Sequence, residues 1–190
     1  MATATPTPIG RIMLNDVRLS FPGLFKAEAF KPGDEAKFKA TLLIEKGSQL
    51  DKDVRAKILA VLKEKFPQKA DAILKQIQNN PNKFCYQDGD TKSYDGYEGM
   101  MALSAKSKTR PLVIDRDRSA LSEEDGKPYA GCYVNARIDL FAYDSQGVGI
   151  SASLGGVQFW RDGDSFGGGR PADADEFAEA TEGADASDFS

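Results

Sequence analysis

Residues 130–143 alternate between apolar and polar side chains along their whole length, the pattern of a β-strand with one buried face. The apolar positions are Cys132, Val134, Ala136, Ile138, Leu140 and Ala142, and the positions between them are Tyr133, Asn135, Arg137, Asp139, Phe141 and Tyr143. A slip of one residue in pairing would turn the polar set into the core, so the hydrophobic pattern fixes the register. The segment therefore predicts a strand that buries one face.

The rest of the chain predicts two strands, a helical insertion and then several more strands. Residues 9–21 alternate, but the parity changes at Asn15–Asp16, which predicts a β-bulge, and Phe21–Pro22–Gly23 is expected to end that strand. Further strands are predicted at 36–45, 99–108, 111–114 and 148–161, and two helices at about 48–66 and 68–79, the first opened by a capping box at Ser48 and Asp51. This order favours a mainly β protein, a closed antiparallel barrel with a helical insertion.

The sequence contains no histidine, which removes the usual general base and the commonest metal ligand. With only two cysteines, Cys85 and Cys132, a Cys/His zinc site of four ligands cannot be assembled within one chain. Most hydrolase and transferase designs are therefore disfavoured, and we expect no enzyme activity, cofactor or metal. Two cysteines fit a reducing compartment as free thiols, with one disulfide between them as the alternative.

Charge is divided unevenly along the chain. No lysine or arginine follows Arg170, whereas seven acidic residues do, so residues 1–170 hold 25 basic and 22 acidic groups, a net charge of +3. A mildly basic body with an acidic tail is typical of proteins that bind nucleic acids or partners. The tail contains Phe177, Asp185, Asp188 and Phe189 and lacks the apolar content that ordering requires, so we expect it to be disordered.

These patterns divide the chain into a flexible N-terminus at residues 1–8, one barrel domain at 9–163, and a Gly-rich linker with the acidic tail at 164–190. The first eight residues have neither a basic start nor an apolar stretch, so they predict no secretory signal. No apolar run approaches the roughly 18 residues that a membrane span needs. We therefore expect a cytoplasmic protein that does not contact membranes.

The polar side of residues 130–143 is unusual because it is rich in aromatic rings. Unpaired bases stack on such rings with little dependence on sequence. The aromatic residues expected to stack on bases are Tyr133, Phe141, Tyr143, Tyr94, Tyr97 and Trp160. Basic residues that recur on neighbouring strands are expected to contact phosphates: Lys37, Lys39, Lys106, Lys108, Arg110 and Arg137. The alternative is that this side of the strand lies beneath the helices or another sheet layer.

Two other classes of function stay open at this point. Asp115 and Asp117 flank Arg116 and could form part of a metal-dependent nuclease site, although such a triplet is more often a salt-bridged turn. A structural or adaptor protein without DNA affinity is the other alternative.

Three segments carry a resemblance to a known family. They are Gly149–Gly163 (GISASLGGVQFWRDG), Gly131–Arg137 (GCYVNAR) and the acidic end that closes on Asp188–Phe189–Ser190. Together they resemble bacteriophage single-stranded-DNA-binding (ssDNA-binding) proteins of a group first catalogued as a family of unknown function. The resemblance covers most of residues 9–163 and the character of the tail. It implies an OB-fold barrel that protects single-stranded DNA during phage replication or recombination in the host cytoplasm. It also implies that the acidic tail recruits replication or recombination proteins, although Ser190 follows the last phenylalanine here.

Overall fold

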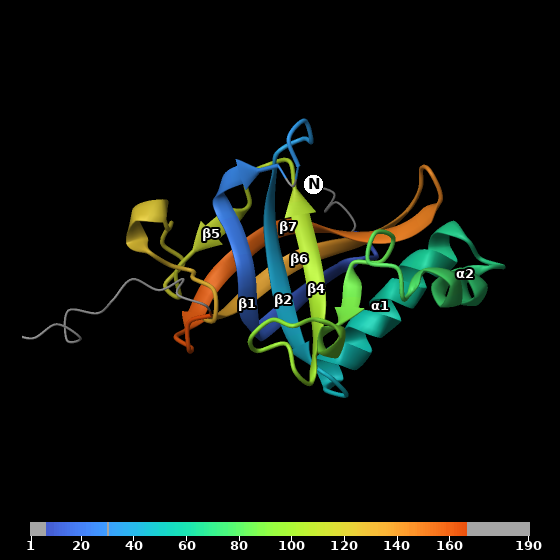
Figure 1. The fold of residues 1–190 in the computed structure, drawn as a ribbon, viewed down its shortest axis with the longest axis horizontal. Helices are drawn as coiled ribbons and strands as arrows, with labels where there is room; N and C mark the ends of the chain where they lie inside the picture. The colour runs from blue at the N-terminus through green and yellow to red at the C-terminus, as the bar shows by residue number, and fades with distance from the viewer. Residues whose placement is uncertain (1–6, 30, 167–190) are drawn as a thin grey trace, which may run out of the picture.

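The computed structural model describes residues 7–29 and 31–166, which form a single sheet with two helices beside it (Figure 1). The elements are β1 (Arg11–Glu28), β2 (Lys37–Glu45), α1 (Gln49–Lys65), α2 (Ala70–Ile77), β3 (Tyr86–Asp88), η1 (Gly89–Thr91), β4 (Met100–Ser107), β5 (Leu112–Ile114), η2 (Glu123–Asp125), β6 (Tyr133–Asp144) and β7 (Val148–Arg161). The strand order is β3-β4-β2-β1-β6-β7-β5, and β4 also pairs with β7.

The pairing of β4 with β7 closes β1, β2, β4, β7 and β6 into a barrel. This closing contact is parallel and pairs Lys106 with Ser153, whereas the other neighbours around the barrel are antiparallel. Figure 1 shows β1, β2 and β4 side by side in front, with β6 and β7 crossing behind them and the helices beside one end. The predicted OB-fold-like barrel with a helical insertion is confirmed.

Strand β1 runs from one layer of the barrel to the other, and its pairing is interrupted by three register shifts. Its first half pairs with β6, and the register shifts between Leu14 and Val17, where Asp16 has φ 53°. This is the predicted bulge. The prediction that the strand ends at Phe21 is wrong, because β1 continues to Glu28 along β2 after a second shift between Ser20 and Gly23. Phe21 and Pro22 form a second bulge, and β1 continues to pair with β2 after it.

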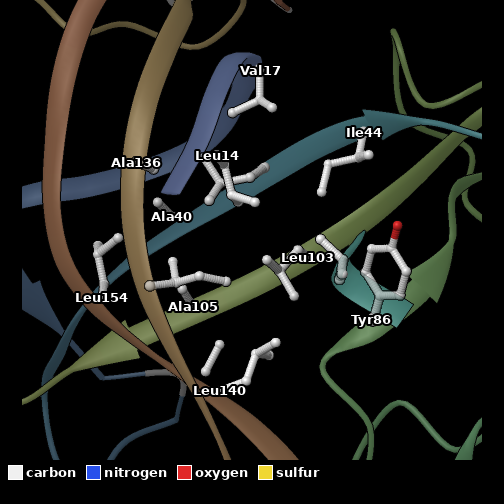
Figure 2. Close-up of a cluster of buried hydrophobic side chains, with 14 of the residues drawn as sticks. Leu14, Val17, Ala40, Ile44, Tyr86, Leu103, Ala105, Ala136, Leu140 and Leu154 are labelled. Atoms are coloured by element: carbon white, nitrogen blue, oxygen red, sulfur yellow. The ribbon is translucent and has the colours of Figure 1, made fainter. Parts of the chain in front are cut away.

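The barrel interior is filled by the apolar sides of these strands (Figure 2). The predicted buried face of β6 is confirmed, since Val134, Ala136 and Ile138 are all 0% exposed. Figure 2 shows Leu14 of β1, Ala136 of β6, and Leu103 and Ala105 of β4 as members of one buried cluster. The polar side of β6 therefore faces away from this core.

Helix α1 is held to the sheet by a buried carboxylate. Ser48 caps the helix as predicted, with its Oγ accepting a hydrogen bond from the Asp51 amide at 3.2 Å. The carboxylate of Asp51 accepts hydrogen bonds from Tyr86 Oη at 2.6 Å, Gly47 N at 2.9 Å and Arg55 Nε at 2.9 Å. Burial raises the pKa of Asp51, but the three hydrogen bonds outweigh burial and hold the pKa below its usual value.

Both cysteines are free, so the disulfide alternative is wrong. Burial raises the pKa of the Cys85 thiol to about 12 and that of Cys132 to about 11. Within residues 7–29 and 31–166, neither helix has the length and apolar character that crossing a membrane requires.

Candidate nucleic-acid interface

Basic side chains meet on the outward side of β2 and β4, as predicted. Lys39 and Lys106 are directly paired across these two strands. The aliphatic stem of Lys39 lies against Gly23 of β1, where a Cβ would stand 3.1 Å from Lys39 Cγ. Together with Lys37, these lysines line a cleft of about 300 Å³. Two strands thus supply a compact group of cations.

Acidic residues from the end of β1 and from the segment that follows it share this cleft. Glu28 Oε2 lies 3.5 Å from Lys39 Nζ, and Glu35 Oε2 lies 3.1 Å from Lys108 Nζ. Both pairs are largely exposed, and exposed pairs typically contribute only about 0–1 kcal/mol. A phosphate group can therefore replace these carboxylates at small cost.

Three aromatic rings form a second cluster on the outward side of the sheet. The ring of Phe21 meets that of Tyr94 edge-on at 4.9 Å between centroids, and Tyr94 meets Tyr97 at 5.2 Å. Phe21 is 48% exposed and Tyr94 is 53% exposed. The bulge that carries Phe21 lies between the Ser20–Thr41 and Gly23–Lys39 pairs. The backbone of Phe21 therefore lies two residues, roughly 7 Å, from Gly23, the partner of Lys39 across β1 and β2.

Tyr97 is part of this cluster but is not available for stacking. It is only 3% exposed, its Oη donates to Ser20 Oγ at 2.9 Å, and it packs on Leu43 and Ala102. The segment between β3 and β4 folds across the outward side of β2, which buries the ring. The prediction that Tyr97 stacks on a base is therefore wrong, because its ring is buried and packs against Tyr94.

Phe21 was missed by the sequence analysis, which treated it as the end of a strand. Its φ is 46°, a left-handed backbone conformation that typically costs a non-glycine residue about 1–3 kcal/mol. Such strain often marks a functional position. The signal in the sequence is an aromatic residue directly before Pro22–Gly23, at the point where a bulge interrupts pairing.

Arginine side chains cover Tyr133 from two sides. Arg18, its partner across β1 and β6, lies 5.8 Å from the ring centroid, and Arg161 lies 3.6 Å from it. Arg18 also lies 4.1 Å from the ring centroid of Phe166. Asp16 pairs with Arg161 at 2.7 Å. Tyr133 therefore lies in a row of alternating rings and guanidinium groups that continues from the aromatic cluster.

Phe141 and Tyr143 lie away from this row, whereas Trp160 directly precedes Arg161 in β7. Phe141, 44% exposed, is eight residues from Tyr133 along β6, which corresponds to about 26 Å. Tyr143 lies beyond it, where its Oη donates to Asn82 O at 3.4 Å. Trp160 is 36% exposed, with Arg116 5.0 Å from its ring centroid. The alternative that this side of β6 is core is not borne out, yet its aromatic residues do not form one compact site.

The residues predicted to contact phosphates also lie in separate parts of the surface. The guanidinium of Arg137 lies against Gly155 of β7, and Arg110 lies 5.7 Å from the ring centroid of Phe25. Only Lys37, Lys39, Lys106 and Lys108 gather around one part of the surface.

The two aspartates of the nuclease alternative are already engaged. Asp115 Oδ2 lies 2.9 Å from Lys127 Nζ, and this contact holds the pKa of Asp115 below its usual value. Asp117 accepts a hydrogen bond from Ser119 N at 2.9 Å. In the described part of the chain, no three Asp, Glu, Cys or His side chains are grouped so that they could hold a metal ion. The tail residues Phe177, Asp185, Asp188 and Phe189 lie outside the described residues.

Comparison with known proteins shows that the chain is similar to ssDNA-binding proteins of bacteriophages. The sequence profile of the family described as Enterobacter phage Enc34, ssDNA-binding protein matches residues 10–189. Protein p50 of Acyrthosiphon pisum secondary endosymbiont phage 1 is 50% identical over 169 residues, covering 88% of this chain and 92% of that protein. The ssDNA-binding protein of bacteriophage Enc34, solved in complex with ssDNA, superposes with a TM-score of 0.70 at 28% identity, covering 83% of this chain and 90% of the solved one. The ssDNA-binding protein gp2.5 of bacteriophage T7 shares the fold, with a TM-score of 0.53 at 18% identity over 90% of this chain and 96% of that one.

Proposed function

Since the chain belongs to the family of the Enterobacter phage Enc34 ssDNA-binding protein, we propose that it binds single-stranded DNA with little sequence preference and has no enzyme activity. Its role is to protect single strands during phage DNA replication or recombination in the host cytoplasm.

The observation that carries this proposal is the exposed Phe21–Tyr94 pair beside Lys39 and Lys106. Aromatic rings hold unpaired bases by stacking, and lysines neutralise the phosphates that join those bases. We refer to Phe21, Tyr94, Lys39 and Lys106 on the outward side of β1, β2 and β4 as the front face. Tyr133, Arg18 and Arg161 extend it around β1. Phe141, Tyr143 and Trp160 remain proposed contacts for a longer strand.

Fluorescence titration with oligo(dT) tests this function. We expect binding to weaken as salt rises, with a log–log slope of about −0.7 for each phosphate neutralised. Replacing Lys106 with Ala should make the slope shallower by about 0.7, whereas Lys75→Ala on α2 should leave it unchanged. Duplex DNA should bind much more weakly because its bases are hidden in the stack. Equal affinity for duplex and single strand at physiological salt would contradict the stacking proposal.

The acidic tail is proposed to compete with DNA and to recruit partners. The last described residue is Phe166, whose ring lies over Arg18 and lines a cleft with Phe21 and Tyr94 of the front face. Seven carboxylates on a short tether give a high local concentration of negative charge near the lysines. DNA that displaces the tail would leave Phe177 and Phe189 free to bind a replication or recombination protein.

Removing residues 171–190 should strengthen binding to oligo(dT) severalfold at low salt. The gain should shrink as ionic strength rises, because the Debye length falls from about 10 Å at 0.1 M to about 3 Å at 1 M. The measurement compares the full-length and shortened proteins across one salt series. Identical affinities at every salt would leave the tail without a competing role, and weaker binding after truncation would indicate that the tail helps to hold DNA.

A further inference from the structure

Phe166 occupies a position built for a flat ring at the edge of the front face. Its ring lies over the guanidinium of Arg18, 4.1 Å from Arg18 Cζ to the ring centroid. The guanidinium is held in place by two carbonyl oxygens, since its Nε donates to Gly131 O at 3.0 Å and its Nη2 donates to Asp164 O at 2.6 Å. Arg18 is therefore a fixed platform.

Apolar side chains and a glycine surround the rest of the Phe166 ring. Phe166 packs on Leu43, Tyr97 and Ala102, the small apolar cluster outside the barrel. Gly96, with φ 81°, faces the ring edge, and any Cβ at this residue would collide with Phe166. The absence of a side chain at Gly96 thus leaves room for a ring. We call the space bounded by Arg18, Gly96 and Tyr97 the ring seat.

The ring seat opens directly onto the exposed aromatic pair. Phe21, Tyr94 and Phe166 line one cleft of about 450 Å³. A strand of DNA that stacks a base on Phe21 or Tyr94 would therefore carry a neighbouring base to the ring seat.

We propose that the ring seat binds one nucleobase of single-stranded DNA, and that Phe166 takes the place of this base when DNA is absent. The proposal rests on the proposed function and names one subsite within it. A guanidinium plane stacks on a nucleobase as it does on a phenyl ring. Any base has a flat face, so such a site is tolerant of sequence.

Entry of a base displaces the ring of Phe166 and leaves the hydrogen bond from Arg18 Nη2 to Asp164 O in place. Tyr129 and Arg18 hold residues 162–164, since Tyr129 Oη donates to Asp162 Oδ1 at 2.6 Å and Arg18 Nη2 to Asp164 O at 2.6 Å, whereas the Phe166 amide donates to Ala130 O at 3.1 Å. Occupation of the ring seat is thereby coupled to movement of Phe166, the last described residue before the acidic tail.

The first test compares oligo(dT) with an abasic oligonucleotide of the same length, using the full-length protein. Phe166→Ala should tighten binding of oligo(dT), by up to the roughly 5- to 150-fold that one base stack is worth, and leave abasic binding unchanged. Phe25→Ala, which removes another ring that lies against an arginine, is the matched control and should not change the ratio of the two affinities. Unchanged or weaker oligo(dT) binding by Phe166→Ala, or an equal gain on both oligonucleotides, would overturn the proposal.

The second test follows the displaced ring directly. Phe166→Trp in a Trp160→Phe background places the only indole of the chain in the ring seat. Saturating oligo(dT) should shift its emission to the red as the indole moves into water, whereas the abasic oligonucleotide should not. Emission unchanged at saturation would exclude displacement. Failure of the wild-type protein to bind oligo(dT) would instead refute the proposed function itself, so the two failures are distinguishable.

Discussion

Removing the rings of Phe21 and Tyr94 together is expected to weaken binding of oligo(dT) by roughly 2–6 kcal/mol, at about 1–3 kcal/mol for each ring that stacks on a base. Both rings are about half exposed, so each leaves surface on which a base can stack, and Phe21 lies two residues from Gly23, the partner of Lys39. Fluorescence titration of Phe21→Ala, Tyr94→Ala and the double variant measures the effect.

A matched control comes from Leu112 on the edge strand β5. Leu112 is 62% exposed, more than either aromatic ring, and it lies outside the front face. Leu112→Ala should leave oligo(dT) binding unchanged. If the double variant bound as tightly as Leu112→Ala, the front face would not be the site of stacking.

Phe21→Gly separates function from stability. Glycine adopts positive φ without the cost that Phe21 bears at φ 46°. The glycine variant should therefore be at least as stable as Phe21→Ala in urea unfolding, while binding oligo(dT) as weakly. A glycine variant that is stable but binds oligo(dT) weakly would indicate that the strained Phe21 is retained for binding.

The elements of the fold could be predicted because their signals are local. The alternation within residues 130–143 fixed which side of β6 is buried, and the parity change at Asn15–Asp16 located a bulge that the register confirms. The capping pattern at Ser48 likewise matches the start of α1. The short strand β3 has only three residues, too few for a period to be recognised.

The site could be predicted only in part, because it depends on contacts between distant segments. Lys39 and Lys106 were found from their spacing, since outward positions on neighbouring strands stay together. Tyr97 was misjudged because no local pattern reveals that the segment between β3 and β4 covers the outward side of β2. Arg18 and Phe166 were not recognised, because their contact joins residues 148 positions apart in a closed barrel.

Replacing Leu14 with Ala is expected to lower the free energy of unfolding by about 2–5 kcal/mol, the usual cost of a buried Leu→Ala change that leaves a cavity. Leu14 is 0% exposed, pairs with Ala136 of β6 and lies in the barrel interior (Figure 2). It also precedes the first bulge of β1, so its side chain is on the buried side of the strand only in the observed register.

Met13 supplies the control for this substitution, because it is adjacent in sequence but lies on the opposite side of β1. It is 50% exposed, so Met13→Ala should change the free energy of unfolding by no more than about 0.5 kcal/mol. Urea unfolding at constant pH measures both variants, and Leu14→Ala should lower the midpoint without a change in slope. Equal midpoints for the two variants would show that β1 pairs with β6 in another register, in which Leu14 does not face the core.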